Sequence, residues 1–177
     1  MGGAGWIPGE THGAQLVRRT ETERAIDLAY KAVARRDLTV AELRTRLERK
    51  HVPPEAIDDA VAELEETGFL DDARYARQFA EDKREIDQWG TDRIAMDLRR
   101  RGIAPQLIDA ALTTHDRDSE MRTALLLLRR RYPVAPRDDR ERDRAWQMLV
   151  RRGYSADLSY DAIRTWERTE RERRRAA

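Results

Sequence analysis

Apolar side chains recur every three or four positions along most of this chain, which is the spacing of a buried stripe on an α-helix. The first stripe runs from Ile26 to Val33. A new helix is expected after Thr39, whose hydroxyl forms a capping box with the carboxylate of Glu42. The strict alternation of apolar and polar residues that is typical of strands is nearly absent. The pattern therefore predicts an all-α protein.

This helical pattern repeats at an interval of 51 residues. The first copy contains Leu43, Leu47, Lys50, His51, Val52, Ile57 and Asp58. The second copy has, at the equivalent positions, Ile94, Leu98, Arg101, Gly102, Ile103, Ile108 and Asp109. The third copy retains Ala145, Leu149, Arg152, Gly153 and Tyr154. A period near 50 indicates that one supersecondary unit was copied, so we expect a tandem array of three three-helix repeats, elongated or gently curved.

Helix-ending and helix-starting residues indicate where each repeat lies. We expect the first repeat at residues 21–68, the second at 69–117 and the third at 118–166. Residues 1–20 begin with a glycine-rich stretch and are expected to be disordered. Residues 167–177 alternate acidic and basic side chains, and we expect them to form a charged tail that extends the last helix into solvent.

The composition indicates a modest core. Of 177 residues, 40% are hydrophobic and 39% are charged, so function is expected on an extended surface and not in a deep pocket. The net charge of +1 conceals a gradient, because residues 118–177 contain 16 basic and 11 acidic side chains. This excess permits contact with a polyanion, although a solvated helical surface explains the charge equally well.

The absence of cysteine excludes disulfides, thiolate metal sites and cysteine nucleophiles. No apolar stretch approaches the roughly 18–20 residues that span a bilayer, and the N-terminal residues do not resemble a signal peptide. We therefore expect a soluble, cytoplasmic protein that does not bind membranes. A monomer is expected, because the array buries its own apolar faces.

Catalytic motifs are missing from the sequence. It contains no glycine-rich loop followed by Lys-Ser or Lys-Thr, and the three histidines, His12, His51 and His115, lie far apart without a ligand at metal spacing. We therefore expect no enzymatic activity, no metal and no cofactor.

Basic side chains gather instead on the expected second helix of each repeat. They are Arg44, Arg46, Arg49 and Lys50, then Arg93, Arg99, Arg100 and Arg101, then Arg144, Arg151 and Arg152. The third helix of the first repeat is acidic, and that of the second has no lysine or arginine between Pro105 and Leu112. A helix-turn-helix reader places this third helix in the major groove among phosphates, which would repel an acidic helix. Phosphate contacts or a groove on a protein partner are the better interpretation.

Nine basic residues are therefore the candidates for contact with a partner or with DNA. They are Lys83, Arg84, Arg93, Arg99, Arg100, Arg101, Arg144, Arg151 and Arg152. Three adjacent arginines cannot all form ion pairs within one short helix, and arginine forks suit phosphates or carboxylates. A solvated face with intrahelical ion pairs is the alternative for any single arginine. The aromatic residues Tyr75, Phe79, Trp89, Trp146 and Trp166 are expected to pack in the core.

Several short motifs occur in a characteristic order and spacing. They are Arg35-Arg36-Asp37-Leu38-Thr39, Gly68-Phe69-Leu70-Asp71-Asp72, Tyr75-Ala76, Trp89-Gly90, Arg93-Ile94, Arg101-Gly102-Ile103 and, more loosely, Arg151-Arg152-Gly153-Tyr154. Together they resemble the RecX family of recombination regulators, closely between Ala25 and Leu112. His51 departs from the family pattern, which has glycine at the end of that helix.

The resemblance implies a protein that binds the RecA recombinase in the helical groove of its filament on single-stranded DNA. There it would suppress ATP hydrolysis, strand exchange and the SOS co-protease activity of RecA, with no catalysis of its own. Contact with the DNA would be direct or through RecA. The alternative is a stand-alone helical DNA-binding protein or transcriptional regulator, which would bind a particular duplex tightly.

Overall fold

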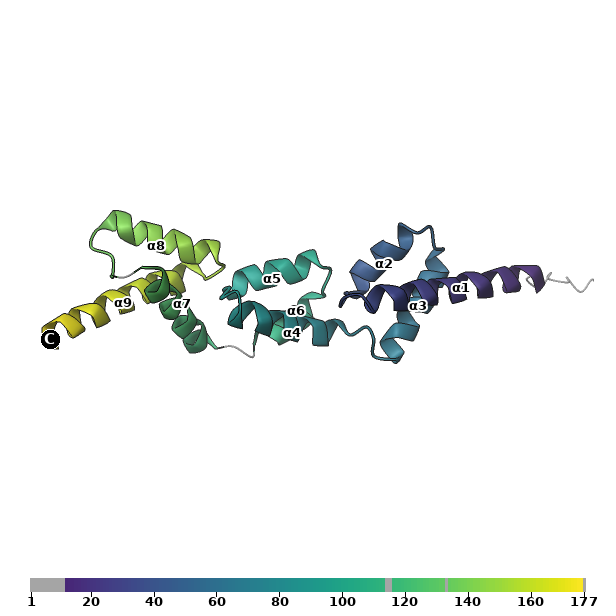
Figure 1. Ribbon diagram of the computed structural model, residues 1–177, viewed down its shortest axis with the longest axis horizontal. Helices are drawn as coiled ribbons and strands as arrows, with labels where there is room; N and C mark the ends of the chain where they lie inside the picture. The colour runs from purple at the N-terminus through teal and green to yellow at the C-terminus, as the bar shows by residue number, and fades with distance from the viewer. Residues whose placement is uncertain (1–11, 114–115, 133, 177) are drawn as a thin grey trace, which may run out of the picture. The chain divides into compact units, whose positions relative to one another are not determined.

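The computed structural model describes residues 12–113, 116–132 and 134–176, and every regular element in these ranges is an α-helix (Figure 1). The prediction of an all-α protein is confirmed. The chain divides into two compact units, Met1–Asp72 and Ala73–Ala177. Among the described helices, none combines the length and the apolar character that crossing a membrane requires.

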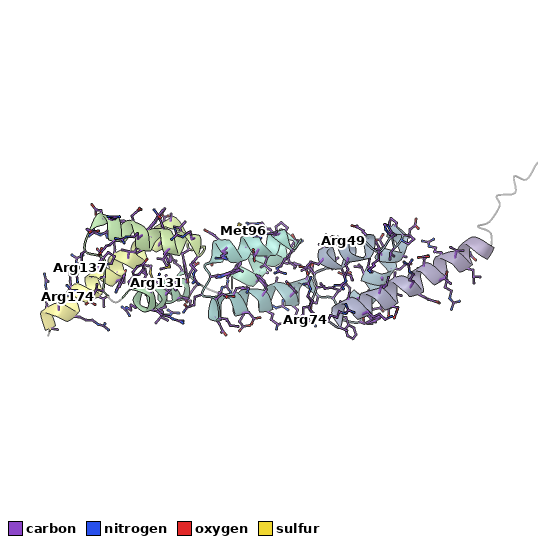
Figure 2. All side chains as sticks on the ribbon, turned by 45° about the horizontal axis from the view of Figure 1, so that its top comes forward. Arg49, Arg74, Met96, Arg131, Arg137 and Arg174 are labelled. Carbon is purple, nitrogen blue, oxygen red and sulfur yellow. The ribbon has the colours of Figure 1, made fainter. Side chains whose placement is uncertain are left out.

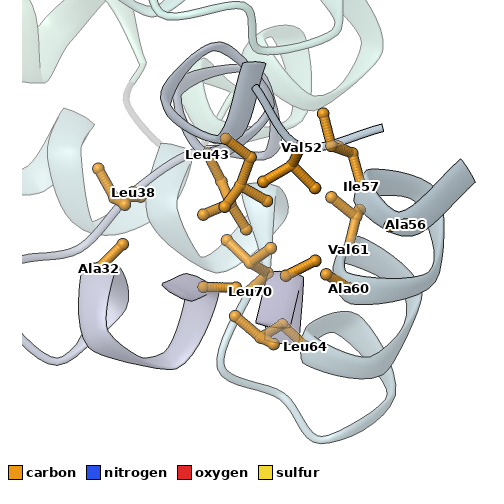
Figure 3. Packing of buried hydrophobic residues seen from close by; sticks show 13 residues of the cluster. Ala32, Leu38, Leu43, Val52, Ala56, Ile57, Ala60, Val61, Leu64 and Leu70 are labelled. Carbon is orange, nitrogen blue, oxygen red and sulfur yellow. The ribbon is translucent and has the colours of Figure 1, made fainter. Parts of the chain in front are cut away.

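The first unit contains one three-helix repeat. Its helices are α1 (His12–Val33), α2 (Val40–Glu48) and α3 (Pro54–Glu66). The core between them is formed by aliphatic side chains, among which Leu43 and Leu64 are completely buried (Figure 3). Thr39 begins α2 as predicted, because its hydroxyl accepts a hydrogen bond from the amide of Glu42 at 3.1 Å.

The beginning of α1 corrects one expectation. The helix already includes residues 12–20, so the prediction of disorder for residues 1–20 is wrong there; residues 1–11 lie outside the described residues. Leu16 and Val17 are 62% and 64% exposed, so the core does not hold this part. Helix-favouring residues such as Gln15, Leu16 and Arg18 support the helix, together with the ion pair between Arg19 and Glu23 at 3.2 Å, one turn apart.

The second unit contains two further three-helix repeats. Their helices are α4 (Asp72–Glu85), α5 (Thr91–Arg100), α6 (Pro105–Leu112), α7 (Arg117–Arg131), α8 (Asp139–Arg151) and α9 (Ala156–Ala176). Asp72, the first residue of α4, still belongs to the first unit. Each repeat has its own apolar cluster, one around Leu98 and the other around Leu149. Helix α9 continues without a break from the last repeat into the expected tail, and Glu167 is still buried.

The 51-residue period is visible in the backbone at the end of each second helix. His51, Gly102 and Gly153 have positive φ angles of 55°, 81° and 89°. In each repeat the amide after this residue donates to a carbonyl five positions earlier, at 3.2, 3.1 and 3.2 Å. This hydrogen bond belongs to the Schellman motif, in which a left-handed residue ends a helix. The three repeats therefore share one helix-ending turn.

His51 is the one non-glycine residue in this set of three turns. A side chain with a Cβ costs roughly 1 kcal/mol in the left-handed region, whereas glycine adopts it freely. We expect His51→Gly to raise the free energy of unfolding by about 0.5–1 kcal/mol, measured by urea denaturation. An unchanged or lower urea midpoint would show that the histidine side chain compensates for its conformation.

In each of the first two repeats, the second helix is capped by an acidic residue from the first helix of the next repeat. Val40 at the start of α2 donates its amide hydrogen to Oδ1 of Asp72 at 3.0 Å. Thr91, 51 positions later at the start of α5, donates to Oε1 of Glu120 on α7 at 2.8 Å. The first amides of a helix have no partner within it, so these carboxylates satisfy groups that would otherwise lack one.

Two replacements of Asp72 distinguish the effect of its hydrogen bond on stability from the effect of its charge. Burial, followed by repulsion from Glu65, Asp71 and Glu42, raises the pKa of Asp72, although the Val40 amide acts in the opposite direction. We expect Asp72→Ala to lower the free energy of unfolding by about 1 kcal/mol through loss of the cap. Asp72→Asn retains an acceptor oxygen without the charge, so its stability near pH 7 should equal or exceed that of the original chain.

The raised pKa of Asp72 predicts the direction in which the stability of the protein changes with pH. Because the folded protein binds this proton more tightly than the unfolded chain, the contribution of Asp72 to stability grows as the pH falls from above its raised pKa toward 3.8. Urea denaturation of the original chain and of Asp72→Asn across this range should therefore show the gap between them closing at low pH. A gap that widens at low pH would contradict the direction of the shift.

Candidate partner-binding surface

Four of the nine candidate basic residues are exposed arginines at the end or in the middle of a second helix. Arg99 and Arg100 are exposed at the end of α5, and Arg151 is exposed at the end of α8. Arg144 is exposed in the middle of α8. Of these four, Arg100 forms an ion pair with Asp97 at 2.8 Å, with 69% of its own side chain still exposed. Their guanidinium groups are accessible to phosphates or carboxylates of a partner.

Three more candidates take part in a row of alternating aromatic and basic side chains. The guanidinium of Arg93 lies 3.9 Å from the ring centre of Trp89, and Nζ of Lys83 lies 4.8 Å from the same ring centre. The guanidinium of Arg101 lies 4.9 Å from the ring centre of Phe79. Such cation–π contacts contribute roughly 0.5–1 kcal/mol each at partly exposed sites. These basic groups therefore stabilise α4 against α5.

Tyr75 continues the same row. Its ring stacks on that of Phe79 with 6.1 Å between centres, and its hydroxyl accepts a hydrogen bond from Arg101 at 3.0 Å. Tyr75, Phe79 and Trp89 are half-buried and pack against the apolar cluster around Leu98, so they border the core of this repeat. Trp166, by contrast, is 3% exposed and packs in the core as predicted.

Arg152 joins the last two repeats of the second unit. Its guanidinium donates to the carbonyl oxygen of Asp87 at 2.6 Å, and its own carbonyl accepts from the amide of Gly90 at 2.8 Å. The amide of Asp92 donates to the carbonyl of Gly153 at 3.0 Å. Amides at the start of α5 therefore bond to carbonyls at the end of α8, which satisfies both helix ends together.

Two close approaches make this junction possible. A Cβ on Gly90 would overlap the backbone of Gly153, and a Cβ on Gly153 would overlap Arg93. The hydroxyl of Tyr154 also donates to the carbonyl of Gln88 at 3.1 Å, and burial raises the pKa of this tyrosine. The pair of glycines therefore allows the two repeats to pack at backbone contact.

Arg84 departs from the expected surface role. The side chain is buried at 8% exposure, and one guanidinium nitrogen donates to the carbonyl of Leu112 at 3.3 Å. Its Nε has no hydrogen-bond partner among the described residues, and desolvation lowers the pKa of the group. Its position on the inner side of α4, one turn after Ala80, explains the burial. Arg84 is therefore not available to a partner in this structure.

The structure also shows basic groups outside the nine candidates. Arg131, labelled in Figure 2, ends α7. With Arg130 and Arg152 it lines a hollow of about 380 Å³. Arg49 directly follows the last residue of α2 and is exposed at the position equivalent to Arg100 and Arg151 (Figure 2). The excess of basic residues toward the C-terminus indicates Arg130 and Arg131. The 51-residue period, which aligns Arg49 with Arg100 and Arg151, indicates Arg49.

The fold and the site together define a class: tandem three-helix repeats with exposed arginines at the ends of their second helices. Models of the RecX first and second three-helix domains match residues 25–64 and 71–112. The crystal structure of RecX from Lactobacillus salivarius superposes with a TM-score of 0.77 at 16% identity, covering 84% of this chain and 98% of that one. That likeness shows the fold.

Sequence relatives show the family. A regulatory protein RecX from Deinococcus radiodurans is 35% identical, covering 83% of this chain and 70% of the relative. One from Trichlorobacter lovleyi is 37% identical, covering 73% and 87%. The chain belongs to the RecX family, as the motifs of its first two repeats predicted.

Proposed function

We propose that this protein binds the RecA filament on single-stranded DNA and inhibits RecA ATP hydrolysis, strand exchange and co-protease activity. It would thereby regulate recombination, DNA repair and the SOS response. The observation that carries this proposal is membership of the RecX family, whose relatives are named regulatory proteins. We further propose that the protein acts in the cytoplasm as a monomer without catalytic activity of its own.

The repeated arginines support this proposal physically. Arg49, Arg100 and Arg151 are exposed at equivalent positions, one in each repeat. A filament presents the same surface many times, so equivalent groups on one chain can each contact an equivalent site. Weak contacts on a common scaffold reinforce one another, because the first raises the effective concentration for the next. A folded repeat protein can therefore bind a filament more tightly than any single arginine contact allows.

A binding experiment with three partners tests the proposal. The labelled protein would be mixed with RecA filaments on single-stranded DNA, with RecA alone, and with duplex DNA of varied sequence. Fluorescence anisotropy should show the tightest binding to the filament. Preference for one duplex sequence over the filament would instead favour a stand-alone DNA-binding protein.

A further inference from the structure

The second half of α9 carries basic side chains that the packing of the third repeat does not use. The last buried residues of the helix are Trp166 and Glu167, whereas residues 168–176 continue in helical conformation at the surface. Figure 1 shows this part of α9 continuing past α7. Residues 168–176 contain five arginines and two glutamates, which leaves a net charge of +3. A basic helical segment therefore extends beyond the core of its own repeat.

Four arginines of α9 form one row. Arg164, Arg168, Arg171 and Arg175 are three or four positions apart, so they lie on one side of the helix at intervals of about 5–6 Å. All four line a hollow of about 630 Å³ beside Met121 of α7. The row therefore presents several guanidinium groups along one side of α9.

The carboxylates in this hollow are partly neutralised by other arginines. Asp161 accepts from Arg117 at 2.8 Å, and Glu167 accepts from Arg142 at 2.6 Å. Glu167 also forms a longer ion pair with Arg171 at 3.5 Å, and Glu172 is the third acidic residue in the lining. The hollow therefore retains an excess of positive charge.

A second hollow, of about 350 Å³, also borders α9. Its basic lining comes from Arg137, Arg142, Arg171 and Arg174, and Figure 2 labels Arg137 and Arg174. Glu167 and Glu170 also line it, and Glu170 forms an ion pair with Arg174 at 3.5 Å. Arg171 lines both hollows, so basic groups cover more than one side of the helix.

The chemistry of this segment favours nucleic acid over protein. Interfaces between proteins depend on buried aromatic or aliphatic anchor residues. Residues 164–177 offer no exposed anchor, because their one aromatic residue, Trp166, is 3% exposed and the others are Glu, Arg, Thr and Ala. Protein–DNA interfaces are more polar and much more basic, and arginine contacts to phosphates supply affinity without reading the sequence.

We propose that the arginine row of α9, Arg164, Arg168, Arg171 and Arg175, binds the phosphate backbone of single-stranded DNA directly. The choice of single-stranded DNA rests on the proposed function, because that is the strand in the filament. Binding is independent of base sequence and sensitive to salt. The row gives this protein its own contact with DNA, separate from its contacts with RecA.

The test measures anisotropy of labelled oligothymidine without RecA, between about 50 and 200 mM salt. Each phosphate contact to a single strand contributes roughly 0.7 to the slope of log affinity against log salt. The triple variant Arg168→Gln, Arg171→Gln and Arg175→Gln should therefore lose about 2 units of slope. The control variant Arg18→Gln, Arg19→Gln and Arg24→Gln removes the same charge from exposed positions of α1 and should keep the slope.

An unchanged slope in the triple variant, with its helical content intact by circular dichroism, would overturn the inference. Failure of the original chain to bind oligothymidine would also overturn it. Loss of RecA inhibition in the triple variant with unchanged DNA binding would assign the row to an acidic protein surface and overturn it as well. Inhibition of the RecA ATPase by the original chain is scored separately, so the proposed function can fail or stand independently.

Discussion

Replacing Gly153 with alanine is expected to destabilise the second unit by about 3 kcal/mol. The left-handed conformation at φ 89° costs an alanine roughly 1–2 kcal/mol. The added Cβ would also overlap that of Arg93 and lie 2.5 Å from its backbone nitrogen, an overpacking that costs roughly 1–3 kcal/mol. Urea denaturation would give the free energy, and hydrogen exchange at the Asp92 amide would show whether the junction opens.

Substitutions at two other glycines measure the backbone-conformation cost and the overpacking cost separately. Gly68 has a positive φ of 73° with nothing within 4 Å of the added Cβ, so Gly68→Ala should cost only about 1 kcal/mol. Gly90 has a φ of −75°, which any residue adopts, but a Cβ added there would overlap the backbone of Gly153. Gly90→Ala should therefore lower the stability through overpacking alone. A Gly153→Ala variant no less stable than Gly68→Ala would contradict the close packing of the two repeats.

The second large effect is expected from the exposed arginines. The variant Arg99→Gln, Arg100→Gln and Arg151→Gln should require about 30-fold more protein for half-inhibition of RecA. This estimate assigns roughly 0.7 kcal/mol to each exposed charge contact, about 2 kcal/mol together. The fold should persist, because these side chains lie outside both apolar clusters of the second unit.

Arg101 is left out of this variant for a structural reason. Its contacts with Tyr75 and Phe79 hold α5 against α4, so its loss would mix binding with stability. The control is again the α1 variant Arg18→Gln, Arg19→Gln and Arg24→Gln, which changes net charge equally. Equal inhibition by the two folded triple variants would remove Arg99, Arg100 and Arg151 from the proposed surface.

The fold was accessible from the sequence because its signals are local. The apolar spacing and the capping box at Thr39 predicted the helices, and the 51-residue period predicted the shared turn at Gly102 and Gly153. The helix at residues 12–20 was missed because the glycine-rich beginning dominated the interpretation of the whole segment. Helix-favouring residues such as Leu16 and Arg18 and the ion pair between Arg19 and Glu23 support the helix there.

The candidate surface was only partly accessible. Sequence spacing placed Arg99 and Arg151 on exposed helix ends, but it could not distinguish them from Arg84, which turns inward. The role of Arg152 at the junction depends on the carbonyl of Asp87, 65 residues away. Such contacts follow from tertiary packing, and no local pattern encodes them.

The steady-state ATPase of the RecA from the same organism, measured on single-stranded DNA with increasing amounts of this protein, tests the central claim most directly. The account predicts strong inhibition well below one molecule per RecA, because one chain would contact several subunits of the filament. An unchanged ATPase rate, with binding to duplex DNA retained, would contradict it.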